Sequence, residues 1–173
     1  MKIKIYQVDA FAKSLFSGNP AAVCPLSSWI ADDLMQKIAQ ENNLSETAFI
    51  VPLNNKVNNN KYDYEIRWFT PTEEVDLCGH ASMAAAHVIF NHLKTNNSNK
   101  IIFKTTKRGN LIITSLDNDY YQLNFPALKS EKIKSLPKAL QESLSIQPKE
   151  IYADLDYLLI YENLEQVNNL KIN

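Results

Sequence analysis

Residues 64–90 read YEIRWFTPTEEVDLCGHASMAAAHVIF, and this stretch predicts the centre of the fold. Polar and apolar side chains alternate at its start, so Tyr64, Ile66 and Trp68 share one face of a predicted strand. After a polar loop, an alanine-rich helix is predicted over about Gly79–Leu93. Alanine is the strongest helix former, and its small side chain lets neighbouring backbones come close. We therefore expect a closely packed helix directly after a half-buried strand.

Further strands and a second long helix are predicted on both sides of this stretch. Ser17–Pro20 predicts a turn, and Ser28 is the candidate N-cap of a helix that ends near Asn42 with Leu34 and Ile38 on its apolar face. Apolar or alternating runs predict strands over residues 2–10, 21–26, 47–53, 62–69, 101–105, 111–115 and 120–125. Polar loops are predicted over 54–61, 70–77 and 94–100. Because short turns join consecutive strands, we expect an α+β fold with an antiparallel or mixed sheet.

The character of the chain changes after Pro126. Residues 127–134 form a polar connection, after which a short helix, one or two strands and a helical tail are predicted over 137–145, 151–161 and 164–170. We therefore expect one domain over 1–126 and a small second segment over 127–173, at the lower limit of what folds alone. A strand that presents Tyr157, Leu159 and Tyr161 without cover predicts a homodimer or a missing second half.

Composition excludes several classes of protein. The 173 residues carry a net charge of −1, whereas nucleic-acid-binding domains are basic, and hydrophobic residues make up 45%, enough for a core. No apolar run approaches the roughly 18 residues of a membrane span. Only Cys24 and Cys78 are cysteines, which excludes a disulfide framework and favours the reducing cytoplasm.

Cys78-Gly79-His80-Ala81-Ser82 is the strongest local candidate for a functional site. Unpaired backbone N–H groups and the positive end of the helix dipole favour an anion at a helix start. In that position the thiol of Cys78 is expected to have a lowered pKa, and His80 adds a titratable donor. The alternative is structural: Gly79 in a tight turn, His80 as a surface group and Cys78 as a small core residue.

Ser45-Glu46-Thr47 is a second candidate, at the junction of the long helix and a strand. A carboxylate in apolar surroundings holds its proton more tightly, as general acid–base catalysis near neutral pH requires. The alternative places Glu46 in solvent at the start of the strand. The acids within residues 73–76 suggest metal ligands, but no paired His or Cys motif accompanies them, so no metal site is predicted.

Three motifs stand in an order that resembles the N-terminal half of the phenazine-biosynthesis PhzF family. They are GNPAAV at the start, SETAF after the long helix, and FTPTEEVDLCGHA before the alanine-rich helix. The PhzF family is similar in fold to diaminopimelate epimerase and proline racemase. The resemblance implies that 1–126 is one α/β half wrapped around a central helix, and that 127–173 begins a second, similar half, with the active site between the two.

The resemblance also implies a chemistry, which is a cofactor-independent proton shift on a small carboxylate such as a dihydro-hydroxyanthranilate. Glu46 matches the family's acid–base residue and His80 its GH-motif histidine. The predicted substrate contacts are Gly18, Asn19, Cys78, Gly79, Ala81 and Ser82.

The second half of such proteins carries an acidic, glycine-rich motif that nothing in this chain matches. Impaired activity is therefore expected of the chain by itself. Two alternatives remain: a non-catalytic small-molecule binding or assembly module, and a cysteine-dependent racemase or epimerase using Cys78.

Overall fold

The computed structural model describes residues 2–53, 62–93, 98–117, 119–125, 127 and 129–173. The chain divides into two compact units, Met1–Phe125 and Pro126–Asn173, and each is described by itself. The predicted loop over 54–61 and most of the one over 94–100 lie outside the described residues. No helix among the described residues is long and apolar enough to cross a membrane.

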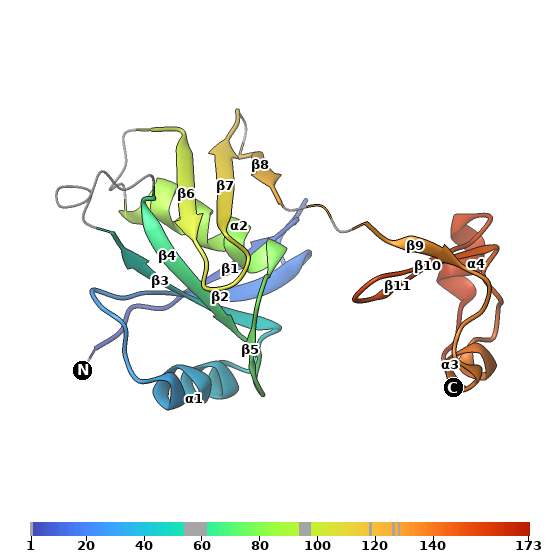
Figure 1. Cartoon of the computed structure of the whole chain (residues 1–173). Helices are drawn as coiled ribbons and strands as arrows, with labels where there is room; N and C mark the ends of the chain where they lie inside the picture. The colour runs from blue at the N-terminus through green and yellow to red at the C-terminus, as the bar shows by residue number, and fades with distance from the viewer. Residues whose placement is uncertain (1, 54–61, 94–97, 118, 126, 128) are drawn as a thin grey trace. The chain divides into compact units, whose positions relative to one another are not determined.

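The first unit is a curled mixed sheet around one helix (Figure 1). Its strands are β1 (Tyr6–Ala10), β2 (Asn19–Pro25), β3 (Glu46–Pro52), β4 (Tyr64–Phe69), β5 (Glu74–Val75), β6 (Lys100–Lys104), β7 (Asn110–Ser115) and β8 (Tyr121–Asn124). They are ordered β1-β2-β3-β4-β6-β7-β8, and β5 pairs with β4. The β2/β3 and β4/β6 pairs are parallel and the others antiparallel. The α+β class and the mixed sheet are confirmed.

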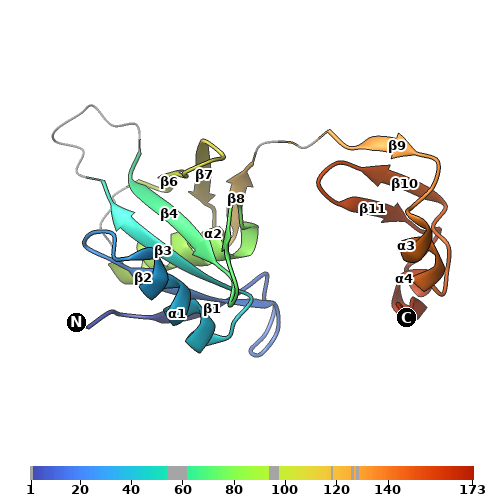
Figure 2. The ribbon, with the colours of Figure 1, turned by 60° about the horizontal axis from the view of Figure 1, so that its bottom comes forward.

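Helix α2 (Gly79–Val88) is the centre of this unit. It contacts β1 and β8, the two ends of the strand order, as well as β2 and β3, so the sheet wraps around it (Figure 2). Seven of its ten residues are buried, five of them alanine or valine, and small side chains permit this close approach. The helix continues as a π-helical turn, η1 (Ile89–Leu93), which agrees with the predicted end at Leu93.

Helix α1 (Asp32–Asn42) packs on the other face of the sheet against β3 and β4. The predicted N-cap at Ser28 is wrong, because the N-cap is Ala31, three residues later, and the helix begins at Asp32. The intervening segment instead brings Trp29 against the sheet, where its Nε1 donates to Glu65 at 2.8 Å. Met35 and Ala39 are the buried residues of the helix, whereas Leu34 is exposed.

Both faces of the central strands are therefore buried. In β3, Ala48 and Ile50 face the core around α2, whereas Phe49 and Val51 face the core beneath α1. In β4, Tyr64, Ile66 and Trp68 join the α2 core, as their spacing predicts. Two-sided burial explains why β3 is an apolar run rather than an alternating one.

The second unit is a three-stranded antiparallel sheet with two short helices. It comprises β9 (Glu131–Ile133), α3 (Lys138–Ser143), β10 (Glu150–Ala153), β11 (Tyr157–Ile160) and α4 (Leu164–Asn169). Strand β9 lies in the stretch that was predicted as a polar connection. A strand of three residues is too short for an alternating pattern to be recognised in the sequence. β11 is an edge strand, and its exposed apolar residues are Tyr157, Leu158 and Ile160 rather than Leu159 and Tyr161.

Candidate active site

The starts of two parallel strands and one helix converge at one edge of the first unit. Because β2 and β3 run parallel, with Ala21 opposite Glu46, the turn before β2 lies beside the start of β3. A side-chain hydrogen bond joins the two, from Oγ of Ser45 to Oδ1 of Asn19 at 3.1 Å. The first turn of α2 reaches the same place, since His80 lies against Glu46. The predicted residues Asn19, Glu46 and His80 thus come together from three elements.

Gly18 shapes this edge through its backbone. Its φ is +88°, and a Cβ atom built there would lie 2.3 Å from the carbonyl oxygen of Ala10. A side chain would therefore collide with backbone as well as strain the left-handed conformation. Only glycine lets the turn bring Asn19 to the start of β2.

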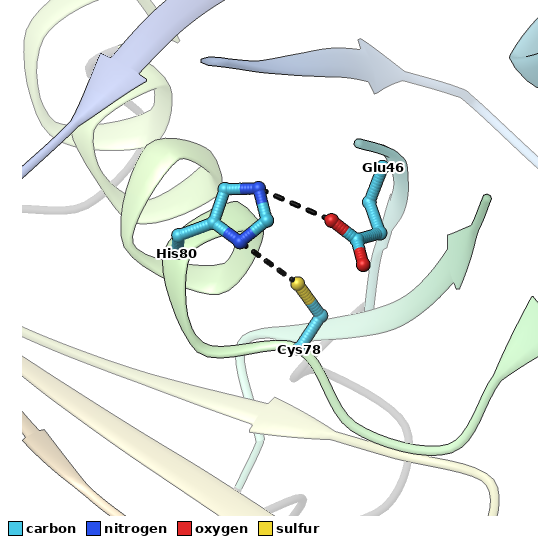
Figure 3. A group of neighbouring side chains, drawn as sticks. All are labelled: Glu46, Cys78 and His80. Atoms are coloured by element: carbon cyan, nitrogen blue, oxygen red, sulfur yellow. Dashed lines mark hydrogen bonds and ion pairs between the residues drawn. The ribbon is translucent and has the colours of Figure 1, made fainter. Parts of the chain in front are cut away.

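Glu46, His80 and Cys78 form one connected group (Figure 3). Oε2 of Glu46 lies 3.2 Å from Nε2 of His80, and Sγ of Cys78 lies 3.3 Å from Nδ1 on the other side of the ring. The Nε2–Oε2 contact is an ion-pair distance without hydrogen-bond alignment, so both buried atoms lack a hydrogen-bond partner. The Glu46 side chain keeps 19% of its surface exposed, against 9% for His80. Since Oε2 itself is buried, the exposed surface of the Glu46 side chain belongs to its other atoms.

The expected thiolate at Cys78 is wrong. The pKa of the Cys78 thiol is raised to about 12, mainly by burial and to a smaller extent by the nearby carboxylate of Glu46. Hydrogen bonds from the backbone N–H groups of Ala81 and His80 lower it, but by less. The helix start therefore acts on the sulfur as predicted, while desolvation, which depends on the surrounding sheet, outweighs it.

The remaining predicted contacts lie in the same helical turn. Ser82 is fully buried, and its hydroxyl donates to the carbonyl oxygen of Cys78. Gly79 is partly exposed, and a Cβ there would lie 3.1 Å from the ring of Phe125. Ala81 is buried and directs its N–H at the sulfur of Cys78. Binding of a substrate by these residues stays a prediction.

Two acids of the loop before α2 are engaged in ion pairs. Arg67 binds Glu74 through two nitrogens, at 2.7 and 2.6 Å, and also contacts Asp32 at 2.8 Å. Lys107 lies 2.7 Å from Asp76. These carboxylates hold the loop in place, and they do not converge on a common point as metal ligands would.

One group of potential metal ligands exists among the described residues, and it is the group of Glu46, Cys78 and His80. The ligand atoms lie within 4.8 Å of one another, and their types suit zinc. However, His80 offers a different nitrogen to each partner, and one ion uses only one of them. The observed arrangement thus fits a chain of polar contacts better than a shared ion.

Two neighbours of the site were not anticipated from the sequence. Phe125, at the end of the first unit, packs against Gly79. Asn42, the last residue of α1, donates from Nδ2 to Oγ1 of Thr47 at 3.1 Å, next to Glu46. Asn42 and Thr47 are only five residues apart in the sequence, on either side of a helix end, so this contact was open to prediction from the sequence. No signal in the sequence links Phe125 to Gly79.

Comparison with known proteins identifies the family. The family model PhzC-PhzF, described as phenazine biosynthesis-like protein, matches residues 8–158. A Pseudomonas aeruginosa protein named as an uncharacterized isomerase is 43% identical over 163 residues, which cover 94% of this chain and 59% of that protein. A similarly named protein of Halalkalibacterium halodurans is 37% identical over 174 residues, covering 100% and 62%. The chain thus spans about three fifths of the length of these relatives.

Comparison with solved structures gives the same family. A PhzF-family protein of Enterococcus faecalis superposes with a TM-score of 0.85 at 39% identity, covering 100% of this chain and 62% of that one. A predicted epimerase of Pseudomonas aeruginosa superposes at 0.68 with 20% identity, which shows the shared epimerase-like fold. The family match over most of the chain and the fold lead to one conclusion: this chain belongs to the phenazine biosynthesis-like, PhzC-PhzF family.

Proposed function

We propose that this chain supplies the acid–base half of a cofactor-independent isomerase. The substrate class is a small carboxylate of the dihydro-hydroxyanthranilate type, and the reaction is a proton shift between two of its carbon atoms. The names of the relatives, which describe isomerases, support the reaction class. The resemblance of the motifs around Glu46 and His80 to those of the family supports the substrate class.

One observation carries the proposal. Glu46 and His80 approach to 3.2 Å through buried atoms that have no hydrogen-bond partner, at an edge where part of Glu46 stays open. Buried polar atoms are normally paired, so a pair left without partners at an accessible edge is typical of a functional site. A carboxylate and an imidazole are the groups most used in general acid–base catalysis.

Each of three residues has a separate role in the proposed proton shift. Glu46 takes a proton from one carbon of the substrate, the double bond shifts, the carboxyl proton exchanges with solvent, and the same carboxyl group delivers a proton to a second carbon. His80 holds Oε2 in place from the buried side, which leaves the rest of the carboxylate for the substrate. Asn19, fixed by Ser45, is positioned beside Glu46 to contact the polar part of the substrate.

Glu46 suits the role of base better than Cys78. A cysteine base must be a thiolate, and burial raises the pKa of Cys78 to about 12. In addition, the sulfur already contacts His80 Nδ1, and Cys78 as a residue is only 7% exposed. The geometry therefore favours the carboxylate mechanism over a cysteine racemase.

A second wall completes the site in this proposal. Proton transfer needs the substrate held within about 3 Å of the base and shielded from water. Glu46 and His80 provide one side, and the relatives have a further two fifths of their length that this chain does not match. We propose that this part, supplied as a partner, forms the opposite side, and activity of the chain alone would instead point to a second copy of the chain.

The test is deuterium incorporation into a dihydro-hydroxyanthranilate in D₂O, followed by mass spectrometry. For this assay the chain is mixed with a partner polypeptide. The partner is the part of the Pseudomonas aeruginosa relative that has no counterpart in this chain. Incorporation is expected to fall about 10²-fold or more in Glu46→Gln, since the amide keeps the shape and loses the transferable proton.

Glu41→Gln is the matched control, because Glu41 is exposed on α1 nearby. It should retain wild-type incorporation. Equal incorporation by wild type and Glu46→Gln would contradict the role of Glu46. Substrate binding without incorporation by the wild type would favour a binding module.

A further inference from the structure

The two nitrogens of the His80 ring have different neighbours, and this asymmetry defines a proton arrangement. Nε2 faces a carboxylate oxygen at 3.2 Å, and Nδ1 faces a thiol sulfur at 3.3 Å (Figure 3). The side chain of His80 is 9% exposed, so water has little access to supply a hydrogen bond that a protein neighbour does not make. A neutral imidazole carries one N–H and one lone pair. Only one of the two tautomers can therefore suit both neighbours.

The carboxylate decides which nitrogen carries the proton. An ionised carboxylate only accepts hydrogen bonds, so a lone pair on Nε2 would face a second acceptor at 3.2 Å. An N–H on Nε2 is attracted to the carboxylate even where its alignment is imperfect. The ring then presents its lone pair at Nδ1, where a donor is required.

The thiol of Cys78 is that donor. Burial raises its pKa to about 12, so the sulfur carries its proton at neutral pH. The backbone N–H groups of Ala81 and His80 point at the sulfur and occupy its acceptor side. Glu46 also lies close to the thiol and competes for its proton. A thiol proton directed at Glu46, however, would leave Nδ1 facing sulfur lone pairs.

The geometry points to Cys78 as a positioning residue: its S–H donates to Nδ1 of His80 and thereby holds the ring proton on Nε2, facing Glu46. This inference rests on the proposed function in one respect, the use of Glu46 and His80 in proton transfer. It assigns Cys78 a task different from that of a cysteine base. The thiol acts through the imidazole and does not touch the substrate.

The tautomer can be read directly by NMR of the full chain labelled with ¹⁵N-histidine. Long-range proton–nitrogen correlations distinguish a protonated from an unprotonated ring nitrogen, and loss of signals in His80→Gln assigns them. The wild type is expected to show His80 with its proton on Nε2. Cys78→Ser keeps a donor and should keep this tautomer. Cys78→Ala removes it and should raise the share of the Nδ1–H form about 2- to 10-fold.

Cys24→Ala is the matched control, because Cys24 is also buried but lies in the core beneath α1. It should leave the His80 signals unchanged. His87, whose Nδ1 lies 3.0 Å from the hydroxyl of Tyr121, reports in each variant whether the unit remains folded. An Nδ1–H tautomer in the wild type, or no change in folded Cys78→Ala, would overturn the assignment.

The NMR readout needs no turnover, so it separates this inference from the proposed function. The expected tautomer shift in the chain, together with no turnover by the combined protein, would remove the isomerase proposal and keep the positioning role. Turnover by the combined protein, together with a His80 tautomer that is the same in Cys78→Ala as in the wild type, would keep the isomerase proposal and remove the positioning role. In active protein, Cys78→Ser should stay within a few-fold of wild-type turnover, whereas a cysteine base would lose far more.

Discussion

Ser45 donates a hydrogen bond from its Oγ to Oδ1 of Asn19 at 3.1 Å, which links the starts of two neighbouring parallel strands. Ser45 immediately precedes Glu46, and Asn19 immediately follows Gly18, whose φ is positive. The bond therefore fixes an amide side chain beside the proposed base.

We expect Ser45→Ala to raise KM about 2- to 10-fold while kcat changes by less than about 2-fold. Without the hydroxyl, Asn19 loses the bond that orients its amide, whereas Glu46 keeps its contact with His80. Steady-state kinetics of the chain combined with the unmatched part of a relative measure both constants. Ser27→Ala, on the exposed segment after β2, is the control. A fall in kcat with unchanged KM would show that Ser45 acts on the chemical step.

Gly18→Ala is expected to destabilise the first unit more than Gly109→Ala. Both glycines have positive φ, +88° and +71°, but only Gly18 also has a backbone oxygen where the Cβ would stand. Gly109→Ala should cost about 1 kcal/mol from left-handed strain, and Gly18→Ala about 3 kcal/mol. Urea denaturation at unchanged m-value measures the difference. Equal losses would mean that the turn relaxes around the new methyl group.

The chain by itself should turn over a dihydro-hydroxyanthranilate at least about 10²-fold more slowly than the combined protein, because only one wall positions the substrate. The measurement compares initial rates with and without the unmatched part of the Pseudomonas aeruginosa relative. The combined protein carrying Glu46→Gln provides the background rate. Full activity of the chain alone would show that residues of this chain supply both walls.

The chain should self-associate through β11. Tyr157, Leu158 and Ile160 are 45%, 52% and 37% exposed on an edge strand, and such strands readily pair with another chain. Leu158→Lys combined with Ile160→Lys should shift the mass in solution, measured by light scattering, towards the monomer. Leu34→Lys, on the exposed side of α1 at 38%, should not. A wild-type monomer at all concentrations would contradict this expectation.

Stability should fall with rising alkaline pH because of the two buried thiols. Burial raises the pKa of both Cys24 and Cys78 from 9.0 to about 12. Above pH 9 the unfolded chain loses these protons while the folded chain keeps them, so the unfolding free energy decreases as pH rises towards 12. Each thiol contributes a slope of up to about 1.4 kcal/mol per pH unit. Urea unfolding at pH 9–11 should show a shallower fall in Cys24→Ala, and an unchanged slope would contradict the shift.

Much of the first unit follows from local pattern. The alternation in Tyr64–Phe69, the alanine run of α2 and the turn at Gly18 each reflect a rule that acts within a few residues. Because such rules consider only a few neighbouring residues, they predicted the start of α1 wrongly. Ser28 is a residue type that caps helices well, but the next residue, Trp29, hydrogen-bonds to Glu65, 36 residues away, and the helix begins only at Asp32.

The sequence by itself determined the order of the motifs, the α+β class, the family and the candidate residues Asn19, Glu46 and His80. Only the tertiary structure decided how they meet. Glu46 and His80 are brought to 3.2 Å by the wrapping of the sheet around α2, and the same wrapping desolvates Cys78. A helix start is visible in sequence and lowers the pKa of a thiol, whereas desolvation depends on every segment that covers it. The thiol is therefore protonated, because burial is a property of the assembled fold.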